Sequence, residues 1–196
     1  MTSIAITPTL QRMHQLAFNP GSWMHDAWWT QLELTSWQDC YQRHASCRAA
    51  IDRLIRKRSA LDGITLPGRL TSHQKVLMDM ERDFGRFIAA LGLIALNNPA
   101  HLLLKEHRQA LSFLLEAQHC NQLLGLYQGW SDTSLPVAAS EFPDRALQVG
   151  MNWWLRDADS DPVTHLLSLR LPPPKQVPLL PADHAHPWLL KIGRFL

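Results

Sequence analysis

The sequence predicts an all-α protein, and three observations support this fold class. Leu (33) and Ala (19) far outnumber Val, Ile and Thr, which total 22. Unbranched side chains lose little rotamer freedom in a helix, so this ratio favours helices over a β-sandwich or a β-barrel. Apolar residues also recur at spacings of three and four, and proline and glycine separate these stretches. We therefore expect a single irregular helical domain of about six to eight helices.

The length of the chain suits one medium domain. It has 196 residues, of which 46% are hydrophobic, so one continuous core can form. We expect the helical domain to cover residues 1–171, followed by a proline-rich linker and a short terminal helix over residues 172–196. The three cysteines are an odd number in a long chain, which argues against a disulfide scaffold.

Two short helices are predicted near the N-terminus. Thr7-Pro8 is typical of a helix start, and the helix that follows is expected to end near Ala17. The turn Asn19-Pro20-Gly21 comes next, and Ser22 can cap a second helix that is rich in tryptophan.

A stronger helix is predicted from Ser36 to a stop near Gly63. Its residues at spacings of three and four are Trp37, Cys40, Tyr41, His44, Cys47, Ile51, Leu54 and Ile55. Such spacing places all of them on one side of a helix, so we expect one continuous buried face.

The next helix begins at a capping box formed by Thr71 and Gln74. Its apolar stripe consists of Leu77, Met80, Phe84, Phe87, Ile88, Leu91 and Ile94. Gly85, Ala89 and Gly92 lie beside this stripe, and small residues allow a neighbouring helix to approach closely.

Proline marks the starts of the later helices and the end of the predicted helical domain. Helix starts are predicted at Asn98-Pro99, Pro143 and Asp161-Pro162. Pro172-Pro173-Pro174 then stops the last of them. A final short helix is expected from Pro187; because it is too short to be stable alone, it must dock on the body, dock on a partner, or fray.

Metal binding and catalysis have little support in the sequence. Cys40, His44 and Cys47 could share a zinc ion, but they lie on the predicted core face, so packing is the better interpretation. The chain has no Gly-x-Ser-x-Gly elbow, phosphate loop, dinucleotide fingerprint or His-Glu-x-x-His motif. We therefore expect neither enzymatic activity nor a cofactor.

Cations gather near the end of the predicted helix 36–63. Arg53, Arg56, Lys57 and Arg58 follow one another closely there. Such residues favour the helix dipole, and they can also attract an acidic protein partner. Nucleic acid ranks third, because no aromatic interleaving or known binding motif accompanies the charge.

Tryptophan is unusually frequent, with eight residues against two tyrosines. Two pairs are adjacent in the chain, Trp28-Trp29 and Trp153-Trp154. Neighbouring residues on a helix point about 100° apart, so one ring of each pair is expected at an edge unless the helix is packed from both sides. An exposed tryptophan would be a good contact anchor.

Three segments resemble one protein family. Leu16-Ala17-Phe18-Asn19-Pro20-Gly21-Ser22-Trp23-Met24-His25 resembles the N-terminal signature of the SctK family, also called the YscK/OrgA family, of bacterial type III secretion. Gly150-Met151-Asn152-Trp153-Trp154-Leu155 and Ser168-Leu169-Arg170-Leu171-Pro172 are similar to the C-terminal part of the same family. The stretch between them is matched only in its helical character.

The resemblance implies a non-enzymatic adaptor of the cytoplasmic sorting platform of the injectisome. Members of the family join the forkhead-associated-like cytoplasmic domain of the inner-membrane ring protein to the pod protein, and so to the ATPase complex. The chain would then be a bacterial cytoplasmic protein at the inner face of the injectisome, needed for protein secretion and virulence. It would bind these two proteins, without nucleic acid and without inserting into the membrane.

The residues expected to carry this function are hypotheses from charge and exposure. Arg53, Arg56, Lys57 and Arg58 would provide charge complementarity, and Trp28 or Trp29 an apolar anchor. The matched family positions are expected to be structural; they are Phe18, Pro20, Trp23, His25, Trp153, Leu169, Arg170 and Pro172.

Two other functions stay open. The main alternative is a helical nucleic-acid-binding or regulatory protein that uses the basic segment Arg48 to Arg58, and salt-sensitive binding would reveal it. The other is a helical enzyme built around His25 or His44, for which converging polar groups in a pocket would be the sign.

Overall fold

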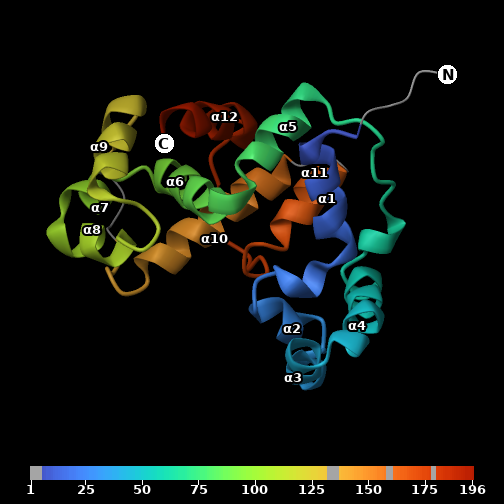
Figure 1. Ribbon diagram of the computed structural model, residues 1–196. Coiled ribbons are helices and arrows are strands. Elements are labelled where there is room, and N and C mark those ends of the chain that lie inside the picture. The colour runs from blue at the N-terminus through green and yellow to red at the C-terminus, as the bar shows by residue number, and fades with distance from the viewer. Residues whose placement is uncertain (1–5, 132–136, 158–160, 178–179) are drawn as a thin grey trace. The chain divides into compact units, whose positions relative to one another are not determined.

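The computed structural model describes residues 6–131, 137–157, 161–177 and 180–196. These residues form twelve α-helices and three 3-10 helices with no strand, which confirms the all-α prediction (Figure 1). The described helices outnumber the predicted six to eight because several predicted helices are interrupted. None of them is both long enough and apolar enough to cross a membrane.

The helices belong to two compact units. The first unit comprises residues 1–82 and 160–173, and the second comprises residues 83–159 and 174–196. The first contains α1 (Pro8–Phe18), η1 (Pro20–Ser22), α2 (Ala27–Gln31), α3 (Thr35–Arg43), α4 (Ala45–Arg58), η2 (Leu61–Gly63), α5 (Ser72–Asp79) and α11 (Pro162–Ser168). The second contains α6 (Phe84–Leu96), α7 (Ala100–Leu103), α8 (Lys105–Leu111), α9 (Ala117–Leu126), α10 (Phe142–Arg156) and α12 (Ala185–Phe195). The short η3 (Glu81–Asp83) contains the boundary.

The predicted continuous helix from residue 36 to residue 63 is wrong. His44 has extended backbone angles (φ −121°, ψ 105°) and separates α3 from α4. The guanidinium of Arg48 donates to the carbonyls of Tyr41 (3.0 Å) and Gln42 (3.1 Å), so α3 can end there with these carbonyls satisfied. Trp37 and Leu54 of the predicted buried face are consequently 49% and 38% exposed.

The core of the second unit is built on a close crossing of α6 and α10, which lie side by side in Figure 1. A Cβ atom on Gly92 would lie 1.8 Å from the carbonyl oxygen of Ala146, and one on Gly150 would lie 2.0 Å from that of Ile88. The predicted close approach is therefore confirmed at Gly92. A Cβ atom on Gly85 would meet nothing within 4 Å, so no close approach is found there.

Both tryptophans of the pair in α10 are buried, so of the two expected arrangements the structure has the one in which the helix is packed from both sides. Trp153 is 1% exposed and Trp154 is 3% exposed. Trp154 packs edge-on against Phe84 of α6, with ring centroids 4.9 Å apart. The indole N–H of Trp153 donates to the carbonyl of Asp183 at 2.8 Å. The helix is therefore packed from both sides.

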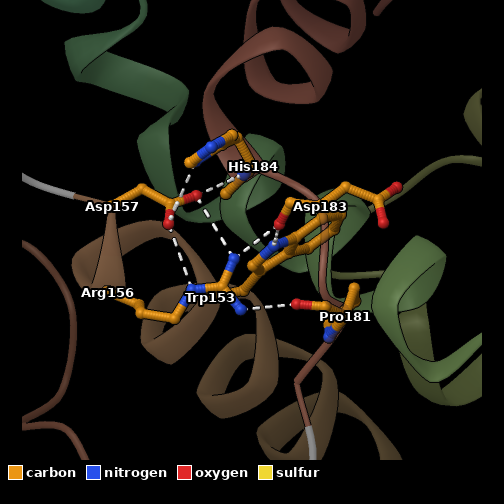
Figure 2. Close-up of polar contacts among 7 residues, drawn as sticks. Trp153, Arg156, Asp157, Pro181, Asp183 and His184 are labelled. Atoms are coloured by element: carbon orange, nitrogen blue, oxygen red, sulfur yellow. Dashed lines mark hydrogen bonds and ion pairs between the residues drawn. The ribbon is translucent and has the colours of Figure 1, made fainter.

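The segment before α12 is tied to the end of α10 by polar contacts (Figure 2). Arg156 donates to the carbonyls of Pro181 and Asp183, both at 2.5 Å, and to the Asp157 carboxylate at 3.0 Å. Asp157 also accepts the N–H of Ala185 at 2.6 Å. Burial alone would raise the pKa of Asp157, but the hydrogen bonds from Arg156 and Ala185 outweigh it and leave the pKa lowered.

The terminal helix docks within the second unit. It begins at Ala185, two residues before the predicted start at Pro187. Leu189 and Ile192 are fully buried, and α12 packs against α6 and α10. Docking supplies the stability that such a short helix lacks by itself.

Two buried histidines hold the backbone of Val137 in the second unit. His101 Nε2 accepts the Val137 N–H at 3.0 Å, and His107 Nε2–H donates to the Val137 carbonyl at 2.7 Å. The two imidazole rings lie 5.4 Å apart, and both pack on Phe142. Burial, reinforced by the charge of His107, lowers the pKa of His101 to about 4.

We expect the second unit to lose stability as the pH falls from 6.5 towards 4. The unfolded chain protonates His101 near its ordinary pKa of 6.5, whereas the folded unit resists protonation until about pH 4. The contribution to stability is therefore complete above pH 6.5 and is lost across this interval. Thermal unfolding of the wild type and of His101→Gln checks this, because glutamine can still accept from Val137 but does not titrate. An equal decrease in both midpoints would contradict it.

Candidate functional site

Two of the three family-like segments contact each other in the first unit. The backbone N–H of His25 donates to the carbonyl of Leu169 at 2.8 Å. The indole N–H of Trp28, just after the first segment, donates to the carbonyl of Leu171 at 2.8 Å. The guanidinium of Arg170 lies over the ring of Trp23, 5.6 Å from its centroid. Segments separated by more than a hundred residues in the sequence thus form one structural element.

A buried carboxylate reinforces this element. Glu81 is 3% exposed and pairs with Arg12, whose Nε and Nη2 donate at 3.2 and 3.1 Å, and also with Arg170. The trio connects α1, η3 and the turn after α11. Burial, together with the charge of Arg12, lowers the pKa of Arg170 from its ordinary value.

A hollow of about 480 Å³ opens beside the first segment. Its lining residues are Gly21, Ser22, Trp23, Met24, Asp26, Trp29, Tyr41, Gln42 and Arg48. They come from η1, from the stretch between η1 and α2, and from α2, α3 and α4, so the fold of the first segment shapes this surface.

Next to the hollow, Asp52 holds η1 against α4. It is 3% exposed and accepts the N–H of Gly21 at 2.9 Å and the hydroxyl of Tyr41 at 3.1 Å. Burial raises the pKa of Asp52 although these bonds oppose the shift, and burial with the Asp52 charge raises the pKa of Tyr41 to about 12. A Cβ on Gly21 would lie 2.8 Å from the Tyr41 ring, so the approach requires glycine. The Asp52 carboxylate therefore joins η1, α3 and α4.

Two of the four predicted partner-binding cations are engaged within the first unit. Arg56 pairs with Asp62 at 2.6 Å, and its guanidinium lies 4.9 Å from the ring centroid of Phe18. Arg58 donates to the carbonyls of Leu32 and Glu33, where the chain leaves α2. Both side chains thus stabilise the fold of α4 with its neighbours.

The other two cations face solvent. Arg53 and Lys57 are exposed, and neither has an ion-pair partner among the residues that the structure describes. Of the two predicted anchors, Trp28 is half-buried, whereas Trp29 is 3% exposed and packs on Tyr41. Of the two alternatives, burial therefore leaves Trp28 as the more accessible side chain.

The residues at the matched family positions lie in different environments, some buried and some exposed. Pro20 starts η1 and is buried, and the indole N–H of Trp23 donates to the carbonyl of Leu16 at 2.8 Å. His25 Nδ1 accepts the N–H of Ala27 at 3.2 Å at the start of α2. Phe18 is 50% exposed under Arg56, Leu169 is buried, and Pro172 is half-buried.

The thiols of Cys40 and Cys47 lie close together although they belong to different helices. A hydrogen bond between them, reinforced by burial, raises the pKa of Cys40. His44 is exposed in the break between α3 and α4. Within the described part of the chain, no group of three His, Cys, Asp or Glu residues is placed to hold a metal ion.

The buried carboxylates of Glu81 and Asp52 were not predicted, although the sequence contains a signal for each of them. Glu81 lies four residues after Leu77 and three before Phe84, on the apolar stripe of the predicted helix. Asp52 lies beside Ile51 and three residues before Ile55, also on an apolar face. An acid on such a stripe indicates a buried hydrogen-bonded or ion-paired carboxylate, because an unpaired buried charge is too costly.

Comparison with known proteins places the chain in one family. The sequence model of a family described as a type III secretion system subunit matches residues 11–173, which include all three family-like segments. Neither the curated proteins nor the solved structures that were compared gave a match. The chain belongs to this family of type III secretion system subunits.

Proposed function

We propose that the chain is an SctK-type subunit and acts as a non-enzymatic adaptor of the sorting platform. It would join the cytoplasmic domain of the inner-membrane ring protein to the pod protein, and so to the ATPase complex. The observation that carries the proposal is the contact between the segments around Trp23 and Arg170. Two of the three segments that resemble the SctK family form a single structural element, as expected if the resemblance reflects a common fold.

The division into two units suits an adaptor with two partners. Each unit has its own buried core, so each can present a surface of its own. The first unit exposes Arg53 and Lys57, and the second exposes Leu103 (62%) and Phe113 (73%). Cations favour an acidic partner and exposed apolar side chains favour an apolar one, so each unit exposes groups that a partner could contact.

The test is size-exclusion chromatography with light scattering. The purified chain is mixed at tens of micromolar with the ring protein's cytoplasmic domain and, separately, with the pod protein from the same genome. We expect a co-eluting complex with at least one of them and a ternary complex when all three are mixed. The same two proteins mixed without the chain serve as the control.

A chain that elutes alone in both mixtures would contradict the adaptor proposal. Binding of duplex DNA instead, with an affinity that falls steeply as salt increases, would support the nucleic-acid alternative.

A further inference from the structure

The side of α4 that faces away from the first unit forms a continuous helical stripe. The other side of α4, which faces the rest of the first unit, carries Ile51, Asp52 and Ile55, and these are at most 3% exposed. The opposite side carries the exposed residues Ser46, Ala49, Ala50, Arg53 and Lys57, with Leu54 at its edge. We name these six residues the outer face of α4. Their spacing of three and four residues along one helix makes them neighbours in space.

The outer face changes in character along the helix. Its N-terminal half is small, with Ser46, Ala49 and Ala50, so the backbone of another helix can approach closely. Its C-terminal half carries Arg53 and Lys57, one turn apart, and Leu54 adds an apolar surface that is 38% exposed. The same face therefore offers a partner both a surface for close packing and positive charge.

The positive charge of this face is not neutralised within the described residues. Asp62 pairs with Arg56 at 2.6 Å and Asp39 with Arg43 at 2.7 Å, and no ion pair joins Arg53 or Lys57 to an acid of the described residues. Asp52 is buried on the inner side of the same helix and accepts from Tyr41. A partner that brings carboxylates to Arg53 and Lys57 would supply the missing counter-charges.

We infer that the outer face of α4 is the docking surface for an acidic amphipathic helix of a protein partner. This inference rests on the proposed adaptor function and specifies one of its contact surfaces. The partner helix packs small or apolar residues over Ala49, Ala50 and Leu54 and aligns carboxylates with Arg53 and Lys57. The alanines determine how closely the helices approach, and the cations determine register and association rate.

Two other occupants fit this surface less well. A second copy of the chain would bring its own Arg53 and Lys57 against these cations, which like-charge repulsion disfavours. A nucleic-acid backbone would use the two cations but not the alanines or the apolar side chain of Leu54. An acidic helix uses all of these features.

The experiment compares two charge-reversal variants of the full chain. R53E/K57E changes the outer face, and R69E/K75E makes the same change in net charge at two other exposed cations of the first unit. A third variant, A50W, adds bulk to the outer face without altering charge. Calorimetric titration measures the affinity of each variant for the ring protein's cytoplasmic domain and for the pod protein. Circular dichroism confirms that each variant is folded.

We expect R53E/K57E to bind one of the two proteins about 30-fold more weakly, and A50W about tenfold more weakly. R69E/K75E is expected to stay within about threefold of the wild type, because surface charges outside an interface contribute little. Wild-type affinity of R53E/K57E and A50W for both proteins would overturn the docking surface and leave the adaptor function intact. If the wild-type chain binds neither protein, the proposed function fails and the inference fails with it. Loss of duplex DNA binding in R53E/K57E, with protein binding unchanged, would assign the face to nucleic acid and overturn the inference.

Discussion

Replacement of Gly92 by alanine is expected to destabilise the second unit by about 3 kcal/mol. Alanine normally stabilises a helix interior by about 1 kcal/mol relative to glycine. Here, however, the new Cβ would lie 1.8 Å from the carbonyl oxygen of Ala146, which is a backbone atom of α10. Neither helix can relieve this clash by a change of rotamer, so α6 and α10 must separate and lose contacts along their length.

Urea unfolding followed by circular dichroism checks this prediction. The matched control is Gly85→Ala in the same helix, because a Cβ at Gly85 meets nothing within 4 Å. We expect this control to be as stable as the wild type or up to about 1 kcal/mol more stable. If Gly92→Ala and Gly85→Ala unfold at the same urea concentration, the close crossing is not what holds the unit together.

Replacement of Glu81 by alanine is expected to destabilise the first unit by about 3 to 5 kcal/mol. Glu81 is 3% exposed and lies between the guanidinium groups of Arg12 and Arg170. Its removal leaves Arg170 partly buried without a counter-charge and leaves the guanidinium groups of Arg12 and Arg170 near each other with no carboxylate between them. The loss therefore combines desolvation with repulsion, and it separates η3 from α1 and from the turn after α11.

Two further variants distinguish this ion-paired trio from an ordinary surface ion pair. Asp83→Asn removes the exposed partner of Arg86 (3.3 Å) and is expected to cost less than about 1 kcal/mol. Combining Glu81→Met with Arg170→Met is expected to recover part of the stability, because it removes the unpaired charge together with its partner. A Glu81→Ala protein as stable as Asp83→Asn would show that the buried trio contributes nothing.

Several helix starts were predictable because the residues that determine them are close in sequence, although the predicted cap at Ser22 is wrong, since Ser22 lies in η1 and α2 begins at Ala27. The capping box at Thr71 and Gln74 is confirmed, with reciprocal hydrogen bonds of 2.9 and 3.2 Å. Asp161 caps α11 by accepting the N–H of Thr164 at 2.8 Å, and Thr7 caps α1 in the same way. A cap joins residues three positions apart, so a sequence pattern contains all of its parts.

The interruption at His44 could not be predicted from periodicity. The spacing of Tyr41, Cys47 and Ile51 suits one helix, yet one extended residue turns the chain and changes which side of it is buried. The contacts that fix the break are made between α3 and α4 by Arg48. Apolar spacing indicates which residues are suited to burial. It does not indicate the direction from which neighbouring helices pack.

The sequence by itself determined the helical fold class, several of the caps and the membership of a type III secretion subunit family. These properties depend on composition and on short motifs. Only the tertiary structure decided which cations of the basic segment are free for a partner. Arg56 and Arg58 bind Asp62 and the carbonyl of Leu32, whereas Arg53 and Lys57 remain on the outer face of α4. The physical reason is that a charged side chain is available to a partner only when no group brought close by folding has satisfied it.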